Sequence, residues 1–234
     1  MVKKRLEQLL NQSRMALLVS LPQNKLHLAK AAVEEGADGI KFHINVAHYA
    51  SGNNFNHFED YVEIFTEVRN TFDGPMGIVI GDDADKISQS EVKKIIECGF
   101  DYFSLYLHHV PSFLVRDDRL TKTVALSSQF HFALRSQLKH FKLFDVKGLE
   151  LSVISPQHYG KILTLEDLFV YQSLIEATDI PTIVPSQKSL SPMDISLLDQ
   201  IGVKAVMLGA VVTGTDEASI RRTIYKFKNA IDQL

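Results

Sequence analysis

The stretch that decides the fold is Gly39-Ile40-Lys41-Phe42-His43-Ile44-Asn45. Apolar and polar residues alternate along it, which predicts a β-strand with apolar side chains on one face and Lys41, His43 and Asn45 on the other. Helical segments precede and follow this strand. That context predicts a parallel sheet covered on both faces, where strands are normally apolar throughout. Three polar side chains on a covered face therefore indicate a functional site, such as the mouth of a closed α/β barrel.

Further strands and helices alternate along the rest of the chain. After a short amphipathic helix at 3–13, the predicted strands are 16–21, 39–45, 76–80, 102–107, 123–126, 149–154, 182–184 and 205–208. The predicted helices are 25–36, 58–72, 88–97, 129–143, 165–177, 192–201 and 216–232, and a short irregular or helical piece at 110–118 follows the fourth strand. Eight strand–helix units without a linker predict the α/β class and one domain over 1–234. We expect a single (β/α)8 TIM barrel, with the amino-terminal helix capping its bottom. The alternative, an open doubly wound sheet, calls for a glycine-rich turn after the first strand, and 20–24 (SLPQN) is not one.

The composition narrows the function classes. Apolar residues make up 45% of the 234 residues, enough for one large core. The net charge of −3 gives no basic field that would favour nucleic acid or an anionic membrane as partner. The single cysteine, Cys98, has no intrachain disulfide partner, which favours the cytoplasm. The amino terminus lacks the apolar region of a signal peptide, and no run of about 18 apolar residues predicts a membrane span.

The main catalytic candidates are Lys41, His43 and Glu150. Lys41 and Glu150 have the same parity on their predicted strands, so both are expected to face the barrel interior. A desolvated lysine can act as a base or nucleophile, and beside a carboxylate it stays charged and can hold an anion. His43 can transfer protons near neutral pH. The alternatives are a structural Lys41–Glu150 ion pair and a histidine that only hydrogen-bonds within the core.

Other polar residues lie where predicted strands end, and four of them are candidates for substrate binding. Asn45 suits an orienting role, and Tyr106 can donate a hydrogen bond unless it is a packed core tyrosine. Asp82 and the adjacent Asp83 have the ligand chemistry of Mg²⁺, but they equally fit a helix cap. His108 and its neighbour His109 are weak evidence for zinc, which needs about three ligands. We assign no metal site or cofactor, and leave Mg²⁺ open.

The ends of the last two strands predict a phosphate site. Gly209 directly follows the strand 205–208 and permits a close approach of ligand to backbone, and Ala210 and Val211 can present free N–H groups. Ser186 and Gln187 follow the seventh strand. Barrels of this class often bind phosphate with these two loops. The alternative is a tight turn in which glycine serves packing alone.

The loop 46–57 (VAHYASGNNFNH) is too long for a simple strand-to-helix connection. Its Ser51-Gly52-Asn53-Asn54 segment has a mobile composition. We interpret the loop as a candidate lid that shuts water out of the site. The alternative is a surface loop without a role in the reaction.

Three segments resemble the ribulose-phosphate-binding barrels, and within them the N-acetylmannosamine-6-phosphate 2-epimerases. The segment 16–20 (ALLVS) resembles their first strand, and 31–41 (AAVEEGADGIK) resembles the segment that leads into their second strand. The segment 201–213 (IGVKAVMLGAVVT) resembles their phosphate-binding segment at the last strand. The resemblance places Lys41 where that family carries a substrate-binding arginine. It departs at the family's catalytic lysine, where this chain has Ile80-Gly81-Asp82, and at the catalytic glutamate, where it has Pro185-Ser186-Gln187.

The sequence therefore leads to three hypotheses. The first is an enzyme that acts on a small phosphorylated metabolite, such as a sugar phosphate, by proton transfer next to a carbonyl, with a Schiff base at Lys41 as a variant. The second is a non-catalytic phosphometabolite-binding or regulatory barrel. The third is a metal-dependent lyase or hydrolase that uses Asp82, Asp83 and His108. A homodimer is compatible with all three.

Overall fold

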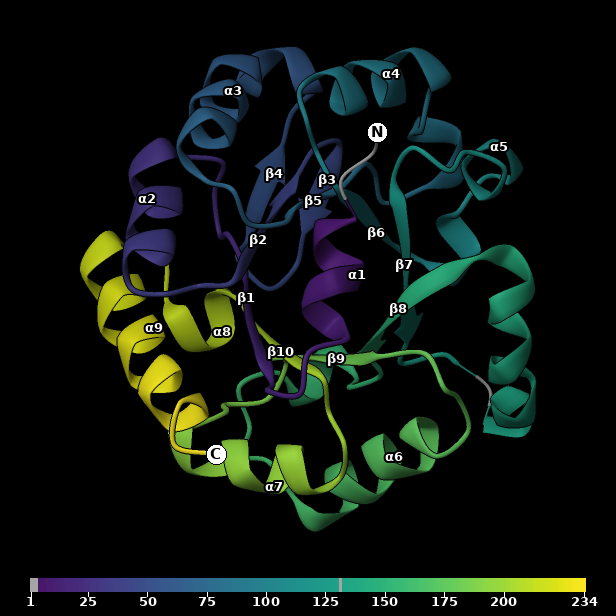
Figure 1. The fold of residues 1–234 in the computed structure, drawn as a ribbon, viewed down its shortest axis with the longest axis vertical. Coiled ribbons are helices and arrows are strands. Elements are labelled where there is room, and N and C mark those ends of the chain that lie inside the picture. The colour runs from purple at the N-terminus through teal and green to yellow at the C-terminus, as the bar shows by residue number, and fades with distance from the viewer. Residues whose placement is uncertain (1–3, 131) are drawn as a thin grey trace.

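The computed structural model describes residues 4–130 and 132–234. In this part of the chain eight parallel strands close into a barrel (Figure 1). They are β1 (Ala16–Ser20), β2 (Gly39–His43), β5 (Met76–Val79), β6 (Tyr102–Tyr106), β7 (Thr121–Ser127), β8 (Val146–Ser152), β9 (Thr182–Pro185) and β10 (Ala205–Leu208). Consecutive strands are neighbours, and β1 pairs with β10 to complete the ring. The predicted (β/α)8 barrel is confirmed.

Helices surround the barrel and follow its strands (Figure 1). The α-helices are α1 (Arg5–Leu10), α2 (Leu26–Glu34), α3 (Val62–Thr71), α4 (Gln89–Glu97), α5 (Ser112–Val115), α6 (Leu165–Ile175), α7 (Ile195–Gln200), α8 (Ala210–Thr213) and α9 (Glu217–Ile231). Short 3-10 segments are η1 (Phe58–Tyr61), η2 (Ala84–Lys86), η3 (Leu107–His109), η5 (Pro156–His158) and η6 (Pro192–Asp194). None of the helices described is long and apolar enough to cross a membrane.

The core has two layers, which explains the alternation in 39–45. Ile40 and Phe42 point outward into the layer between sheet and helices, where the Phe42 ring lies 5.0 Å from that of Phe65 on α3. The inner layer fills the lower barrel and includes Leu6 and Leu10 of α1. The short amino-terminal helix therefore caps the bottom of the barrel, as expected.

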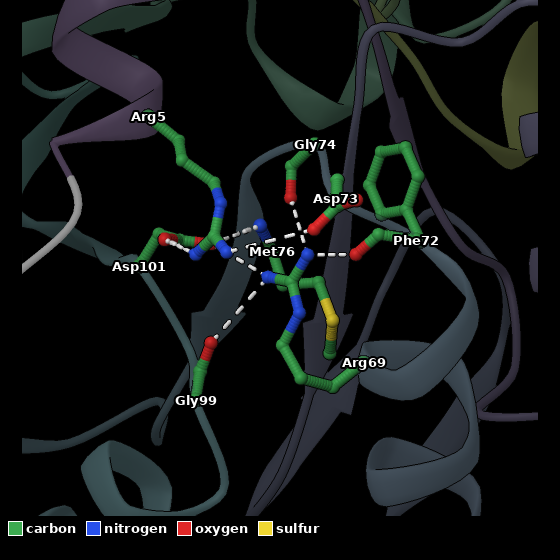
Figure 2. Close-up of polar contacts among 8 residues, drawn as sticks. All are labelled: Arg5, Arg69, Phe72, Asp73, Gly74, Met76, Gly99 and Asp101. Carbon is green, nitrogen blue, oxygen red and sulfur yellow. Dashed lines mark hydrogen bonds and ion pairs between the residues drawn. The ribbon is translucent and has the colours of Figure 1, made fainter.

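An arginine–aspartate cluster fastens α1 to the barrel (Figure 2). The buried Asp101 carboxylate accepts from Arg5 Nη1 at 2.7 Å, from Arg69 Nη1 at 2.9 Å and from the Met76 backbone N–H at 2.9 Å. Arg69 Nη2 also donates to the carbonyls of Phe72 and Gly74. The cluster lies at the amino-terminal ends of β5 and β6, the face of such barrels that serves stability rather than chemistry.

The segment 46–57 differs from the irregular loop that the sequence predicted. It contains an antiparallel hairpin of β3 (Val46–His48) and β4 (Asn53–Phe55). The hairpin is fastened to the β1–α2 loop, because Asn53 Nδ2 donates to the Pro22 carbonyl at 2.9 Å. Gly52, at the turn, has φ of 67°, a conformation that glycine adopts without strain.

The helix predicted at 129–143 is of the 3-10 type. The structure has a 3-10 helix, η4 (Phe132–Phe144), over most of this range, and residue 131 lies outside the described residues. η4 connects β7 to β8, which have seven residues each and are the two longest strands.

Several strands also begin or end at other residues than the sequence predicted. β7 covers Thr121–Ser127 instead of 123–126, and β8 covers Val146–Ser152 instead of 149–154. The pairing of these two strands shifts register between Lys122 and Thr123. Polar residues and Gly148 lie at the start of the two strands, so the pattern of apolar residues missed both beginnings. The amino-terminal helix is also shorter than 3–13, and residues 1–3 lie outside the described residues.

Candidate functional site

A cavity of about 100 Å³ lies at the mouth of the barrel, where the strands end. Side chains from both halves of the chain surround it. They are Ser20, Lys41, His48, Ala50, Tyr106, Glu150, Ser152, Tyr159, Pro185, Ser186, Gln187, Met207, Gly209, Ala210 and Val211. Eight of the twelve residues proposed from the sequence are in this set: Lys41, Tyr106, Glu150, Ser186, Gln187, Gly209, Ala210 and Val211.

A buried ion pair forms the floor of the cavity. Lys41 Nζ lies 2.9 Å from Glu150 Oε2, and both side chains are almost fully buried. Two hydroxyls complete the network: Ser104 Oγ donates to Oε2 at 2.8 Å, and Ser152 Oγ donates to Oε1 at 3.0 Å. Lys41 and Glu150 come from β2 and β8, and both point inward because alternate residues of a barrel strand do so.

The environment keeps the Glu150 carboxylate charged. Burial opposes the charge, but the Lys41 ammonium and the two serine hydroxyls outweigh it, so the pKa of Glu150 stays below its ordinary value. The cavity therefore offers an ammonium and a carboxylate side by side. Such a pair can donate one hydrogen bond and accept a proton at adjacent atoms of a ligand.

Two tyrosines and a glutamine form one wall. Gln187 Nε2 donates to the Tyr159 hydroxyl at 2.6 Å, and Gln187 Oε1 accepts from the Ile154 backbone N–H at 3.1 Å. Burial raises the pKa of Tyr106 and, more weakly, that of Tyr159. Both phenols therefore stay protonated and can donate hydrogen bonds to a ligand.

The turn after β10 presents backbone N–H groups. The Gly209 N–H is already used, because it donates to Ser186 Oγ at 2.8 Å. The N–H groups of Val212 and Thr213 return to the Gly209 carbonyl. In the described part of the chain, the N–H groups of Ala210 and Val211 have no backbone or side-chain acceptor. Since both residues line the cavity, these two donors are available to an anion there.

Two histidine rings, those of His43 and His48, are in contact at one side of the cavity. The His43 ring centroid is 4.4 Å from that of His48 and 4.9 Å from the Phe55 ring of the hairpin. His43 does not line the cavity itself. It contacts Ser20, which lines the cavity and whose Oγ is 3.4 Å from His43 Nε2, and its Nδ1 is buried without a partner among the described residues. Ser20 therefore separates His43 from the cavity.

Both histidines are held neutral. Burial, and then unfavourable electrostatic interactions with His48 and Lys41, lower the pKa of His43 well below its ordinary 6.5. Burial, and then the charge of Lys41, lower the pKa of His48 to about 4. The unfolded chain therefore binds more protons than the native state between pH 6.5 and 4, and the native state loses stability as the pH falls through this window.

We expect this loss to be measurable and to depend on His48. Each histidine held neutral contributes a slope of up to about 1.4 kcal/mol per pH unit to the free energy of unfolding. His48→Gln should remove roughly half of the combined slope between pH 6.5 and 4, as measured by urea unfolding at several pH values. His27→Gln, on an exposed position of α2, is the matched control. Equal slopes for wild type and His48→Gln would contradict the assignment.

Three of the proposed binding residues lie outside the cavity. Asn45 Nδ2 donates to the Ile80 carbonyl and to Glu91, and its φ of 55° turns the side chain away from the direction that strand alternation predicts. Asp82 pairs with Lys86 at 2.6 Å and accepts from the Ala47 backbone N–H at 3.0 Å. His108 is exposed and stacks on Tyr106, with 5.7 Å between ring centroids.

The positions of Asp82, Asp83 and His108 decide whether these residues could bind a metal ion together. Asp83 caps η2, where its side chain accepts from the Asp85 backbone N–H. Within residues 4–130 and 132–234, no three His, Cys, Asp or Glu side chains come together in a way that could hold a metal ion. Asp82, Asp83 and His108 therefore do not form the ligand set that the third hypothesis requires.

Sequence reasoning did not single out His48, Ala50 and Tyr159 as site residues. The first two reach the cavity because the hairpin folds over the barrel mouth, and Tyr159 follows η5 in the β8–α6 connection. The Tyr49 and Tyr159 rings meet edge to face at 5.6 Å and so join the hairpin to that connection. The two strands of the hairpin have three residues each, which is too short for a strand to be recognised by its period.

Comparisons with known proteins identify the fold. The chain matches no protein-family model and no curated protein sequence. Among solved structures, it is similar to thiamine phosphate pyrophosphorylase from Pyrococcus furiosus, with a TM-score of 0.65 and 12% identity over 97% of this chain and 98% of that one. A variant of the tryptophan synthase alpha-subunit from Pyrococcus furiosus gives 0.69 and 11% over 92% and 98%. Phosphoribosyl anthranilate isomerase from Thermus thermophilus gives 0.66 and 10% over 94% and 99%. At such low identities this likeness shows the barrel fold alone.

Proposed function

We propose that this protein is a cytoplasmic enzyme that acts on a small phosphorylated metabolite, such as a sugar phosphate, by proton transfer next to a carbonyl group. Isomerase, epimerase and lyase reactions share this step. One observation carries the proposal: the buried Lys41–Glu150 pair and the free N–H groups of Ala210 and Val211 open into the same cavity. A ligand held by a phosphate at the turn would present its carbon chain to the pair.

The phosphate end is supported by the chemistry of the β10–α8 turn. Phosphate oxygens accept hydrogen bonds from backbone N–H groups, and barrels use the loops after the last two strands for this purpose. Ser186 supports the turn through Gly209. The segment 201–213 resembles the phosphate-binding segment at the last strand of N-acetylmannosamine-6-phosphate 2-epimerases. Two of the similar structures have phosphorylated compounds in their names, a thiamine phosphate pyrophosphorylase and a phosphoribosyl anthranilate isomerase.

The chemical step is assigned to Lys41 and Glu150. Lys41 donates a hydrogen bond to the carbonyl oxygen of the substrate and stabilises the negative charge that develops there. Glu150 accepts the proton from the neighbouring carbon and returns it. When Lys41 turns to the substrate, it weakens its hold on Glu150, and the carboxylate becomes a stronger base. His43 is a positioning residue in this scheme, since it contacts Ser20 rather than the cavity.

This assignment departs from the epimerases that the sequence resembles. Their catalytic lysine and glutamate belong at strand ends where this chain carries Ile80-Gly81-Asp82 and Pro185-Ser186-Gln187. Lys41 and Glu150 would have to supply the acid and base from other strands. A Schiff base between Lys41 and the carbonyl is a variant of the same proposal, and borohydride with a candidate substrate would trap it as a stable adduct on Lys41.

The hairpin β3–β4 is proposed as a lid. The cavity of about 100 Å³ holds only a few water molecules, less than a sugar phosphate needs. His48 and Ala50 of the hairpin line it, and the Tyr49–Tyr159 contact closes the hairpin against the β8–α6 connection. Opening at this contact would admit a ligand, and closing would exclude water during the reaction.

The phosphate end can be tested without knowing the substrate. Ala210→Asp places a negative charge beside the two free N–H groups and should weaken the binding of inorganic phosphate at least tenfold in calorimetric titration. Asn229→Asp adds the same charge on the exposed face of α9 and is the matched control. Equal phosphate affinity in Ala210→Asp and wild type, or no binding by wild type at millimolar phosphate, would refute the assignment.

One observation favours a second candidate, a phosphometabolite-binding barrel without turnover. The Glu150 carboxylate accepts hydrogen bonds from Lys41, Ser104 and Ser152. Three donors make it a weak base unless a ligand rearranges them. Binding of phosphorylated compounds without any proton exchange would decide for this candidate.

A further inference from the structure

One face of the barrel exposes large apolar side chains. They lie on α6, on the segment before it, and on η6 and α7: Ile162, Leu165, Phe169, Met193 and Leu197. Between 43% and 86% of each residue is exposed. Single exposed apolar residues are common, but a group of this size on neighbouring helices is not. We call this group the α6–α7 face.

The two parts of the α6–α7 face adjoin each other. α6 and α7 are neighbours in the helix ring (Figure 1). The Ser189 N–H donates to the Lys161 carbonyl at 2.9 Å, and Lys188 Nζ pairs with Asp167 of α6 at 2.9 Å. These contacts hold the start of α6 against the segment that leads into η6. The exposed apolar side chains of α6 therefore lie on the same side of the molecule as those of η6 and α7 (Figure 1).

The composition of α6 indicates that this surface is covered in the working protein. Tyr171 and Leu174 pack α6 onto the barrel, while Leu165 and Phe169 point the other way. A helix that is apolar on both sides is normally buried on both sides. Five such side chains present on the order of 500 Å² of apolar surface, a large part of the roughly 800 Å² that each partner contributes to a standard stable interface.

The charges beside this face favour a second copy of the same chain as the occupant. Lys161 and Glu166 flank the apolar residues, are exposed and carry opposite signs. Neither has an ion-pair partner in the part of the chain that the structure describes. In a two-fold interface the same patch meets itself, so Lys161 of each copy can face Glu166 of the other. A patch of one sign would instead repel its own copy.

We propose that the α6–α7 face is the surface through which two copies of this chain associate about a two-fold axis. The interface would reach the rim of the site, because Tyr159, which lines the cavity, lies two residues before Lys161. The second copy would thus hold the β8–α6 connection in place, against which the Tyr49 ring packs.

Sedimentation velocity of the full chain tests the proposal. We expect wild type to sediment with twice the 26.3 kDa mass of a single chain at micromolar concentration. Phe169→Glu should raise the dissociation constant at least about 30-fold, as loss of a central aromatic contact does. Tyr225→Glu is the matched control, since it removes an exposed aromatic residue from α9 and should leave the dimer intact. Unchanged thermal unfolding of Phe169→Glu in a dilute, dissociated sample would show that the variant is folded.

A charge exchange identifies the occupant. Lys161→Glu and Glu166→Lys should each weaken the dimer, and the double variant should restore it, because the two positions face each other only across a two-fold axis of identical chains. A single chain at all concentrations would overturn the proposal. So would a dimer that Phe169→Glu leaves intact, or one in which the double variant is no stronger than the single ones.

Discussion

Lys41→Met is expected to lower the free energy of unfolding by about 3–5 kcal/mol, as removal of one partner of a buried ion pair does. The substitution leaves the Glu150 carboxylate buried with two serine hydroxyls and no positive charge within hydrogen-bond distance. The protein then either keeps an uncompensated charge or protonates Glu150. Urea unfolding followed by circular dichroism measures the loss.

The double variant Lys41→Met, Glu150→Leu separates the pair from its neighbours. Since both charges are gone, it should recover most of the stability that the single variant loses. Lys30→Met is the control, because Lys30 forms an exposed pair with Glu67, which is worth less than about 1 kcal/mol. If Lys41→Met proved as harmless as Lys30→Met, Lys41 and Glu150 would not form a tight buried pair in solution.

Asp101→Ala is expected to cost a similar amount, about 3–5 kcal/mol. Two guanidinium groups, those of Arg5 and Arg69, lose their common carboxylate, and the Met76 N–H loses its acceptor (Figure 2). Because Arg5 belongs to α1, the helix should also loosen from the barrel. Hydrogen exchange of the α1 amides should accelerate more in Asp101→Ala than that of the β1 amides.

Asp73→Ala is the matched control for this cluster. Asp73 is fully exposed and lies 4.0 Å from Arg5, so its removal should change neither stability nor α1 exchange. The cluster is at the opposite end of the barrel from the cavity. We therefore expect Asp101→Ala to change stability while phosphate affinity at the mouth, measured under folding conditions, stays as in wild type.

The barrel and the inward direction of Lys41 and Glu150 could be predicted from the sequence, because both follow from local periods. Alternation along a strand fixes which side chains share a face, and eight strand–helix units leave few ways to arrange a parallel sheet. The sequence left open whether Lys41 forms an ion pair or lines a cavity. In the structure it does both, because it pairs with Glu150 and lines the cavity.

The position of Asn45 shows where this reasoning stops. Alternation predicted that it would share a face with Lys41 and His43, but β2 ends at His43 and Asn45 has φ of 55°. Asparagine adopts this left-handed conformation more readily than most residues, and the turn it makes starts the hairpin. Beyond a strand end, side-chain direction depends on turn geometry, which the periodic pattern does not encode.

The path of the chain over the barrel mouth could not be predicted from the sequence either. His48 and Tyr159 are 111 positions apart, yet both line the cavity. Their meeting depends on how the hairpin folds across the strand ends and on the contact between Tyr49 and Tyr159. These are tertiary contacts between connecting segments, and no local propensity reports them.

The most direct test of the central claim is proton exchange at the carbon next to a carbonyl. Aldose, ketose and amino-sugar phosphates are incubated with the protein in D₂O, and the loss of the proton signal is followed by nuclear magnetic resonance. We predict that wild type exchanges this proton in at least one phosphorylated compound and not in its unphosphorylated form. Glu150→Gln should exchange it at least about 100-fold more slowly while still binding phosphate. No exchange by wild type with any compound of the panel, or an equal rate in Glu150→Gln, would contradict the account.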